Sequence, residues 1–186
     1  WYLSSIYYYL HFQYNGWFFF ACMGLAFGFL NLRKSEHSFY ETSFKLFAIA
    51  CVPAYFLSTL WLDLPLWIYI ITVIAALVQV YAWFKFLPIL LKTRKNVLES
   101  YSPLLRYILV FVSFALSIKL LLQWGSTVPI ISQLAFGFRP IVIAYLHLIL
   151  LGIITLFLLF YIYANHLILI SKNIKYGVFV FTIGVL

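Results

Sequence analysis

The chain has 186 residues, of which 66% are hydrophobic, 22% aromatic and only 9% charged. A soluble domain carries roughly 25% charged residues, so this composition excludes an ordinary soluble protein. The formal net charge is +8. Because the cations cluster in short stretches between apolar runs, they indicate the orientation of a membrane protein and not binding to nucleic acid. The expected partner is the lipid bilayer, and other membrane subunits are further candidates.

The first predicted helix covers residues 4–32 and is long enough to cross a bilayer, which takes about 20 residues. It contains the stretch HFQYNGWFFF, in which His11, Gln13 and Asn15 interrupt an aromatic and apolar run. Ionisable residues inside membrane helices are rare and suggest function by default. His11 is therefore a candidate site residue, and Asn15 lies one turn away on the same helix face.

The second and third predicted helices cover residues 43–62 and 66–91. Pro53 lies within the second, and a membrane helix tolerates it because neighbouring groups satisfy the freed carbonyl. Gln79, in the third helix, is expected to form a hydrogen bond with another helix. The cysteines of the chain, Cys22 and Cys51, both lie in apolar runs and are expected to be packing residues.

The fourth predicted helix covers residues 104–124 and carries Lys119 about one turn from its end. The ordinary expectation is that this side chain extends to the membrane surface, and the alternative is an anionic partner such as a haem propionate. The connection 125–139 is too short and too broken by Gly and Pro to cross the membrane. We predict that it caps the bundle at the level of the histidines, with a short helix at IISQLAF. Arg139 follows it as a second candidate for an anionic partner.

The fifth predicted helix covers residues 140–170, and a sixth begins near Ile174. The fifth contains YLHLILLG, which repeats the Tyr-Leu-His of residues 9–11 and again has Gly five residues after the His. His11 and His147 lie 22 and 25 residues before the cations Arg33 and Lys172. At 1.5 Å per residue, both are roughly 33 to 37 Å from that end, at similar depth. Their imidazoles are therefore expected to converge.

Three interpretations of this histidine pair compete. The two side chains form a satisfied hydrogen-bonding pair, or they belong to a proton relay, or they share a metal. Imidazole is the commonest metal ligand, and histidine is the usual axial ligand of haem iron. The metal interpretation makes His11 and His147 the ligands, with haem b as the cofactor and copper or no cofactor as alternatives. Asn15, Lys119 and Arg139 are then further cofactor-binding residues, and catalytic residues are not identified.

The remaining histidines, His37 and His166, are interpreted as a solvated loop residue and an interfacial residue. The connections 33–42, 92–103 and 171–175 carry cations and are predicted to be cytoplasmic. The chain begins at Trp1 and ends inside an apolar run, so we interpret residues 1–186 as a single transmembrane domain of a longer protein. The predicted fold is an all-α, polytopic transmembrane helix bundle with five complete helices and part of a sixth.

The stretches HFQYNGWFFF and AYLHLILLGI together resemble uncharacterised bacterial integral membrane proteins that are distantly related to the large subunit of haem–copper oxidases and nitric oxide reductases. This resemblance covers the two motif helices. It implies haem or metal binding in the bacterial inner membrane. The adjacent His-His pair and the second closely spaced His pair of that superfamily do not occur here, so oxygen or nitric oxide reduction is not implied.

The expected function is accordingly that of a haem- or metal-binding integral membrane protein of respiratory or nitric-oxide type. The alternative is a non-catalytic membrane subunit or transporter scaffold whose buried histidines only form hydrogen bonds.

Overall fold

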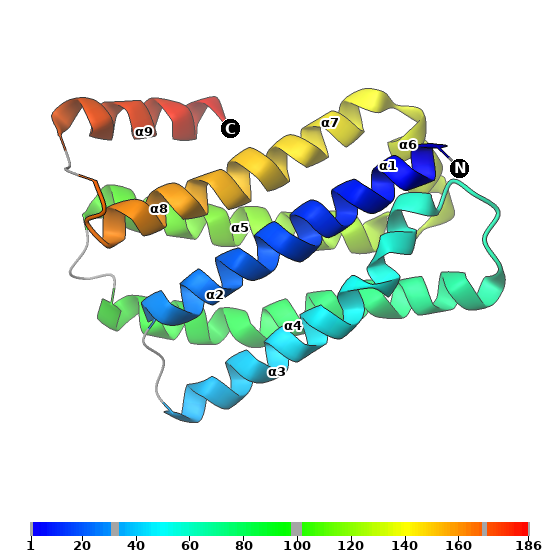
Figure 1. The fold of residues 1–186 in the computed structure, drawn as a ribbon, viewed down its shortest axis with the longest axis horizontal. Coiled ribbons are helices and arrows are strands. Elements are labelled where there is room, and N and C mark those ends of the chain that lie inside the picture. Colours follow the sequence, from blue (N-terminus) through cyan, green and yellow to red (C-terminus); the bar gives the residue numbers. More distant parts are fainter. Residues whose placement is uncertain (1, 31–33, 98–101, 169–170, 186) are drawn as a thin grey trace.

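We describe the protein from a computed structural model, which places residues 2–30, 34–97, 102–168 and 171–185. All regular structure in these ranges is helical. Figure 1 shows long helices lying side by side along the longest axis of the molecule, with the short helix α6 across one end. The predicted all-α class is confirmed.

The first apolar segment forms one continuous helical rod. It consists of α1 (Tyr2–His11), the π-helix η1 (Phe12–Phe18) and α2 (Phe19–Leu30). The π-helical turns begin immediately after His11. The rod runs through the middle of the view in Figure 1, between α7 and α8 on one side and α3 on the other.

The second segment is bent by 47°. It comprises α3 (Lys34–Cys51) and the 3₁₀-helix η2 (Pro53–Thr59). Because proline has no backbone N–H and its ring clashes with the preceding turn, Pro53 accounts for the break. A turn containing Asp63 then leads into α4 (Leu66–Val97).

Proline also begins several of the later helices, at the position where its missing N–H does no harm. α5, α6 and α7 each have a proline in the first turn. The later helices are α5 (Pro103–Gly125), α6 (Pro129–Gly137), α7 (Arg139–His147), the π-helix η4 (Leu148–Thr155), α8 (Leu156–Ala164) and α9 (Lys172–Gly184).

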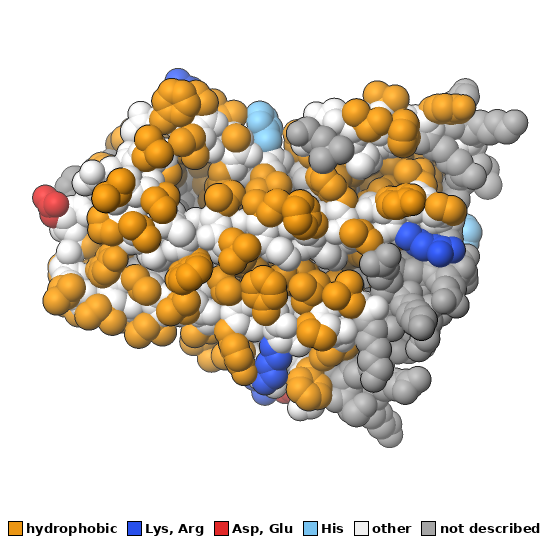
Figure 2. All heavy atoms as spheres, turned by 180° about the vertical axis from the view of Figure 1, so that it is seen from behind, with side chains coloured by type: hydrophobic (Ala, Val, Ile, Leu, Met, Phe, Trp, Pro, Cys, Tyr) orange, Lys and Arg blue, Asp and Glu red, His pale blue; other side chains and the backbone are white. Residues whose placement is uncertain are grey.

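Three described helices are long and apolar enough to cross a membrane: Leu66–Leu91, Pro103–Gly125 and Arg139–Ala164. The bent pair His37–Cys51 and Pro53–Thr59 makes a fourth if it is one span. The predicted count of five complete spans is therefore not confirmed. Residues 2–30 are helical throughout but do not reach the same apolar character, since polar side chains interrupt them. The chain is a membrane protein, and Figure 2 shows one face covered with hydrophobic side chains and with its few charges near the edges.

The helices alternate in direction, so their connections fall at two opposite ends. The ends of α2, α4 and α8, and the starts of α3, α5 and α9, lie at one end of the molecule (Figure 1). The N-terminus, the turn between η2 and α4, and α6 lie at the other end. The described helix ends that flank the three cationic connections thus share one end, as the sequence predicts. Which side of the membrane this end faces stays a prediction.

The main apolar core lies between α3, α4, α5 and α8. Its most buried large side chains come from α5 and α8 and are Ile108, Leu120, Leu156 and Phe160. Aromatic rings of α2 and α3 pack onto it, with the Phe19 and Phe47 ring centroids 5.0 Å apart. The core fixes the positions of α1 and α5 at the end of the bundle where α6 lies.

Candidate functional site

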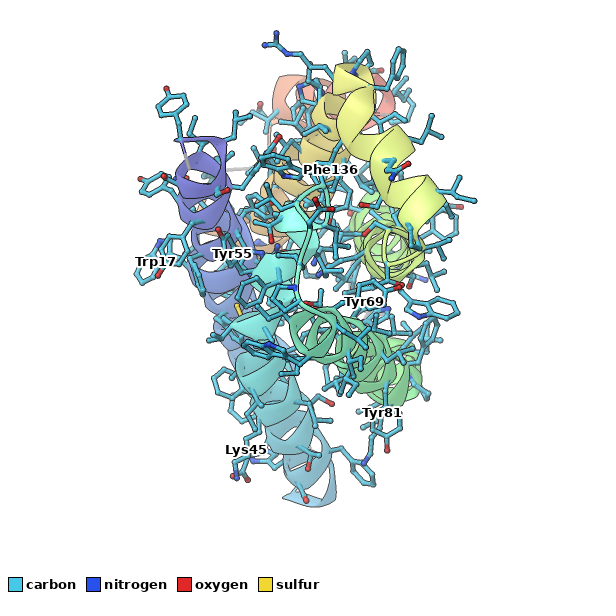
Figure 3. The ribbon with its side chains drawn as sticks, turned by 90° about the vertical axis from the view of Figure 1, so that its right-hand side faces the viewer. Trp17, Lys45, Tyr55, Tyr69, Tyr81 and Phe136 are labelled. Atoms are coloured by element: carbon cyan, nitrogen blue, oxygen red, sulfur yellow. The ribbon has the colours of Figure 1, made fainter. Side chains whose placement is uncertain are left out.

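A cavity of about 540 Å³ lies at the end of the bundle that carries α6. Apolar and aromatic side chains form most of its wall. Its polar wall residues come from α1, η1, η2, α5, the residue directly after α5, and α7. They are Tyr7, His11, Tyr14, Asn15, Ser58, Gln123, Ser126 and Tyr145. Figure 3 looks along the bundle from this end: Tyr55 and Phe136 lie toward the interior, whereas Trp17 points away from it.

The segment 125–139 covers this cavity. Ile131, Leu134 and Phe136 of α6 line it together with His11. The ring of Phe136 packs edge-on against Tyr7 of α1, with centroids 6.1 Å apart. The predicted short helix at IISQLAF, and its position over the level of His11, are both confirmed.

His11 is almost completely buried, with 1% of its surface exposed. Its Nε2 lies 2.9 Å from the backbone oxygen of Cys51, and its Nδ1 lies 3.2 Å from Nδ2 of Asn15. A carbonyl oxygen can only accept and an amide NH₂ can only donate. The ring is therefore neutral, with its proton on Nε2, and both of its nitrogens have protein partners.

The Cys51 carbonyl is available to His11 because the second helix changes its hydrogen-bonding pattern there. The N–H of Tyr55 donates to Val52 at 3.2 Å, in the pattern of the 3₁₀-helix, instead of to Cys51. In return, the Cys51 thiol donates to the backbone oxygen of Asn15 at 3.8 Å, within the π-helical turns. His11 thus joins an irregular stretch of the first helix to the bend of the second. The hydrogen-bonding interpretation accounts for its burial.

His147 lies in a different environment. Its side chain is exposed, while its neighbours Tyr145, Leu146 and Leu148 line the cavity. The ring nitrogens of His11 are hydrogen-bonded to Cys51 and Asn15 and not to His147. The expected convergence of the two histidines is therefore not observed. The reason is the rotation of the helix about its own axis at the end of α7. It directs the residues on either side of His147 toward the cavity and leaves His147 on the outside. Among the described residues, no group of three or more His, Cys, Asp or Glu side chains is placed to hold a metal.

The repeated Tyr-Leu-His motif nevertheless marks a shared local structure. The π-helices η1 and η4 begin immediately after His11 and His147 respectively. Tyr14 of η1 packs with Ile149 and Ile154 of η4. π-helical turns inside α-helices are rare and frequent at functional sites. The motif therefore corresponds to two matching irregular turns beside the cavity, and not to a histidine pair.

Lys119 is 4% exposed, so the expectation that it extends to the membrane surface is wrong. Phe19, Phe20 and Phe47 surround it, and its Nζ lies 6.0 Å from the centroid of the Phe19 ring. These phenylalanines, from α2 and α3, line the small space beside Lys119 together with Asn15 and Gln79.

No described carboxylate pairs with Lys119. Glu41 pairs with Lys45 in a surface ion pair, and Asp63 is exposed in the turn before α4. Arg139 is exposed at the start of α7, so the structure separates the two cations that the sequence suggests for one anionic group.

A pair of glutamines connects Lys119 to the cavity. Gln123, one turn after Lys119 on α5, donates to Oε1 of Gln79 at 3.0 Å, which confirms the expected interhelical bond of Gln79. Gln123 lines the large cavity, and its own Oε1 is buried and has no hydrogen-bond partner among the described residues. Gln79, Asn15 and Lys119 bound a second cavity of about 10 Å³. Asn15 lines both cavities.

No family model matches this chain, and no curated protein and no solved structure matches it. The resemblance to the haem–copper oxidase superfamily stays a prediction, and the geometry of the cavity is the basis for a function.

Proposed function

We propose that the protein is a non-catalytic membrane protein that binds an amphiphilic molecule in the cavity beneath α6. The observation that carries this proposal is the cavity itself, with about 540 Å³ of space, mainly apolar walls and a few polar groups. Small-molecule sites in proteins have this character and typically measure about 300–1,000 Å³. An apolar chain fits the walls, and a polar end fits the side of Asn15 and Gln123.

The polar lining supports binding more than acid–base chemistry. No carboxylate occurs among the described lining residues, and His11, the obvious proton carrier, is held on both ring nitrogens. Haem ligation by His11 has less support, since iron at Nε2 would displace the bond to Cys51 and leave that buried carbonyl without its donor. Buried polar groups without partners destabilise proteins substantially.

We place the protein in the bacterial cytoplasmic membrane, with the end that carries the cationic connections facing the cytoplasm. The alternation of cationic and cation-poor connections between the two ends supports this orientation. On this proposal the cavity opens toward the outer half of the membrane.

Photo-crosslinking in lipid nanodiscs tests the proposal. A long-chain fatty alcohol that carries a diazirine is neutral, so its binding does not depend on a charge in the site. We expect mass spectrometry to find its label concentrated on α6 and α7. Ala135→Trp and Ala144→Trp place a large ring at the cavity wall and should each reduce this label severalfold.

Ala21→Trp is the matched control, because Ala21 is exposed on α2 and does not line the cavity. It should leave the label unchanged. Label spread evenly over the exposed helices, and unaffected by either cavity substitution, would refute the proposal.

A further inference from the structure

We propose that the bound molecule is an anionic amphiphile, a long-chain carboxylate, and that Lys119 is its counter-ion. This inference rests on the proposed function and specifies the chemistry of the same site. Its starting point is that Lys119 is the buried cation whose charge the described part of the chain does not balance with a carboxylate.

A buried ammonium group without a partner is unfavourable, because an apolar interior does not replace its hydration. The ring of Phe19, at 6.0 Å, supplies a cation–π contact. Such contacts are modest compared with the loss of hydration. Charges inside membrane bundles generally pair or mark the path of a ligand. An anion from outside the chain is the partner that this environment lacks.

The polar groups lead from the large cavity to Lys119. Asn15 borders the large cavity on one side and the small cavity beside Lys119 on the other. The Gln123–Gln79 bond forms a second link between the same two spaces. Asn15 thus belongs to both cavities, whereas Gln123 lines the large one and Gln79 the small one. The amide N–H groups of these side chains can donate hydrogen bonds to an anion.

The large cavity determines what is attached to the carboxylate. The large cavity has about 540 Å³ of space and mostly apolar walls, far more than a simple anion such as chloride or acetate would fill. A carboxylate attached to a hydrocarbon chain uses both the charge and the walls.

Competition against the diazirine alcohol in phosphatidylcholine nanodiscs tests the inference, with palmitate, hexadecanol and acetate as competitors. For the natural protein, we expect palmitate to compete at a concentration roughly tenfold or more below that of hexadecanol, as charge-assisted hydrogen bonds are stronger than neutral ones. Lys119→Gln should remove this preference, so that palmitate and hexadecanol compete at similar concentrations. Lys119→Arg should retain part of it.

Lys85→Gln is the matched control. Lys85 is also a helix lysine with aromatic neighbours, with Nζ 5.7 Å from the Phe39 centroid and 5.6 Å from the Tyr81 centroid, but it does not line either cavity. The palmitate preference should survive this change. Circular dichroism and size-exclusion chromatography identify variants that fail to fold, and Lys119→Met then provides a second uncharged replacement.

The outcomes separate the two proposals. Equal competition by palmitate and hexadecanol overturns the anionic inference and leaves the proposed function intact. A preference for palmitate that persists in Lys119→Gln and Lys119→Met also overturns it, as does protection by acetate alone. Failure of both long-chain competitors overturns the proposed function itself.

Discussion

His11 and Lys119 are both ionisable and both buried, yet their surroundings assign them opposite roles. His11 has a partner on each ring nitrogen and joins two irregular helix segments. Lys119 has aromatic rings around it and no described carboxylate partner. The sequence identifies His11 and Asn15 correctly as an interior polar pair, because both interrupt an apolar run. It misplaces Lys119, since nothing near that residue in the chain reveals the phenylalanines of other helices that enclose it.

Replacement of His11 tests its structural role. His11→Ala should lower the free energy of unfolding by about 1–3 kcal/mol, because the buried Cys51 carbonyl loses its donor. His11→Gln should recover part of this loss, since its amide can donate to the same oxygen. Thermal unfolding in detergent measures both. His147→Ala is the control and should leave the midpoint nearly unchanged, because His147 is exposed. Equal losses from the two alanine variants would contradict the asymmetry and revive a joint role for the histidines.

At the scale of the helices, apolar length and proline predict most of what the structure contains. The spans Leu66–Leu91 and Pro103–Gly125 agree closely with the predicted 66–91 and 104–124. The fifth helix ends at Ala164 instead of residue 170. The π-helices η1 and η4 are not predicted, because apolar length and proline positions do not distinguish π-helical turns from α-helical ones. The repeated motif signals that the two helices match, but its meaning is visible only in three dimensions.

Gly152, inside η4, tests how tightly other segments approach that irregular turn. A Cβ at this position would lie 3.6 Å from Leu148, 3.7 Å from Val185 and 3.9 Å from Phe111, which are ordinary contacts. Gly152→Ala should therefore be tolerated. Gly152→Leu adds three further carbons with little space for them, and overpacking typically destabilises by about 1–3 kcal/mol.

Thermal unfolding again provides the measurement for this position. Gly24→Leu is the matched control, because nothing lies within 4 Å of a Cβ built at Gly24, and its midpoint should barely change. If Gly152→Leu unfolds at the same temperature as Gly24→Leu, the packing around η4 is looser than described.

At the scale of the whole molecule, the cationic connections and the cavity lie at opposite ends of the bundle. The helix ends that flank the cationic connections lie at one end, while α6 and the cavity beneath it lie at the other (Figure 1). The sequence predicts this alternation, since it depends only on the order of apolar and cationic stretches. It does not predict the cavity, because that requires the relative rotation of α1, α5, α6 and α7. Lys119 and Gln123 share a face of α5, and only the rotation of that helix decides whether they face lipid or the interior.

Cysteine accessibility in bacterial cells tests the orientation that follows from this arrangement. Asp63, Gln133 and Ser102 are exposed, the first two at the end with the cavity and the third at the start of α5, at the cationic end. In a background with Cys22→Ala and Cys51→Ala, a membrane-impermeant maleimide should modify Asp63→Cys and Gln133→Cys on intact spheroplasts. Ser102→Cys should react only after permeabilisation, because the positive-inside rule places the cationic end in the cytoplasm.

Labelling of Ser102→Cys alone on intact cells would invert the orientation and make the cavity accessible from the cytoplasmic leaflet. Equal labelling of Asp63→Cys and Ser102→Cys would contradict the transmembrane arrangement itself, since α4 and α5 place these two residues at opposite ends of the bundle.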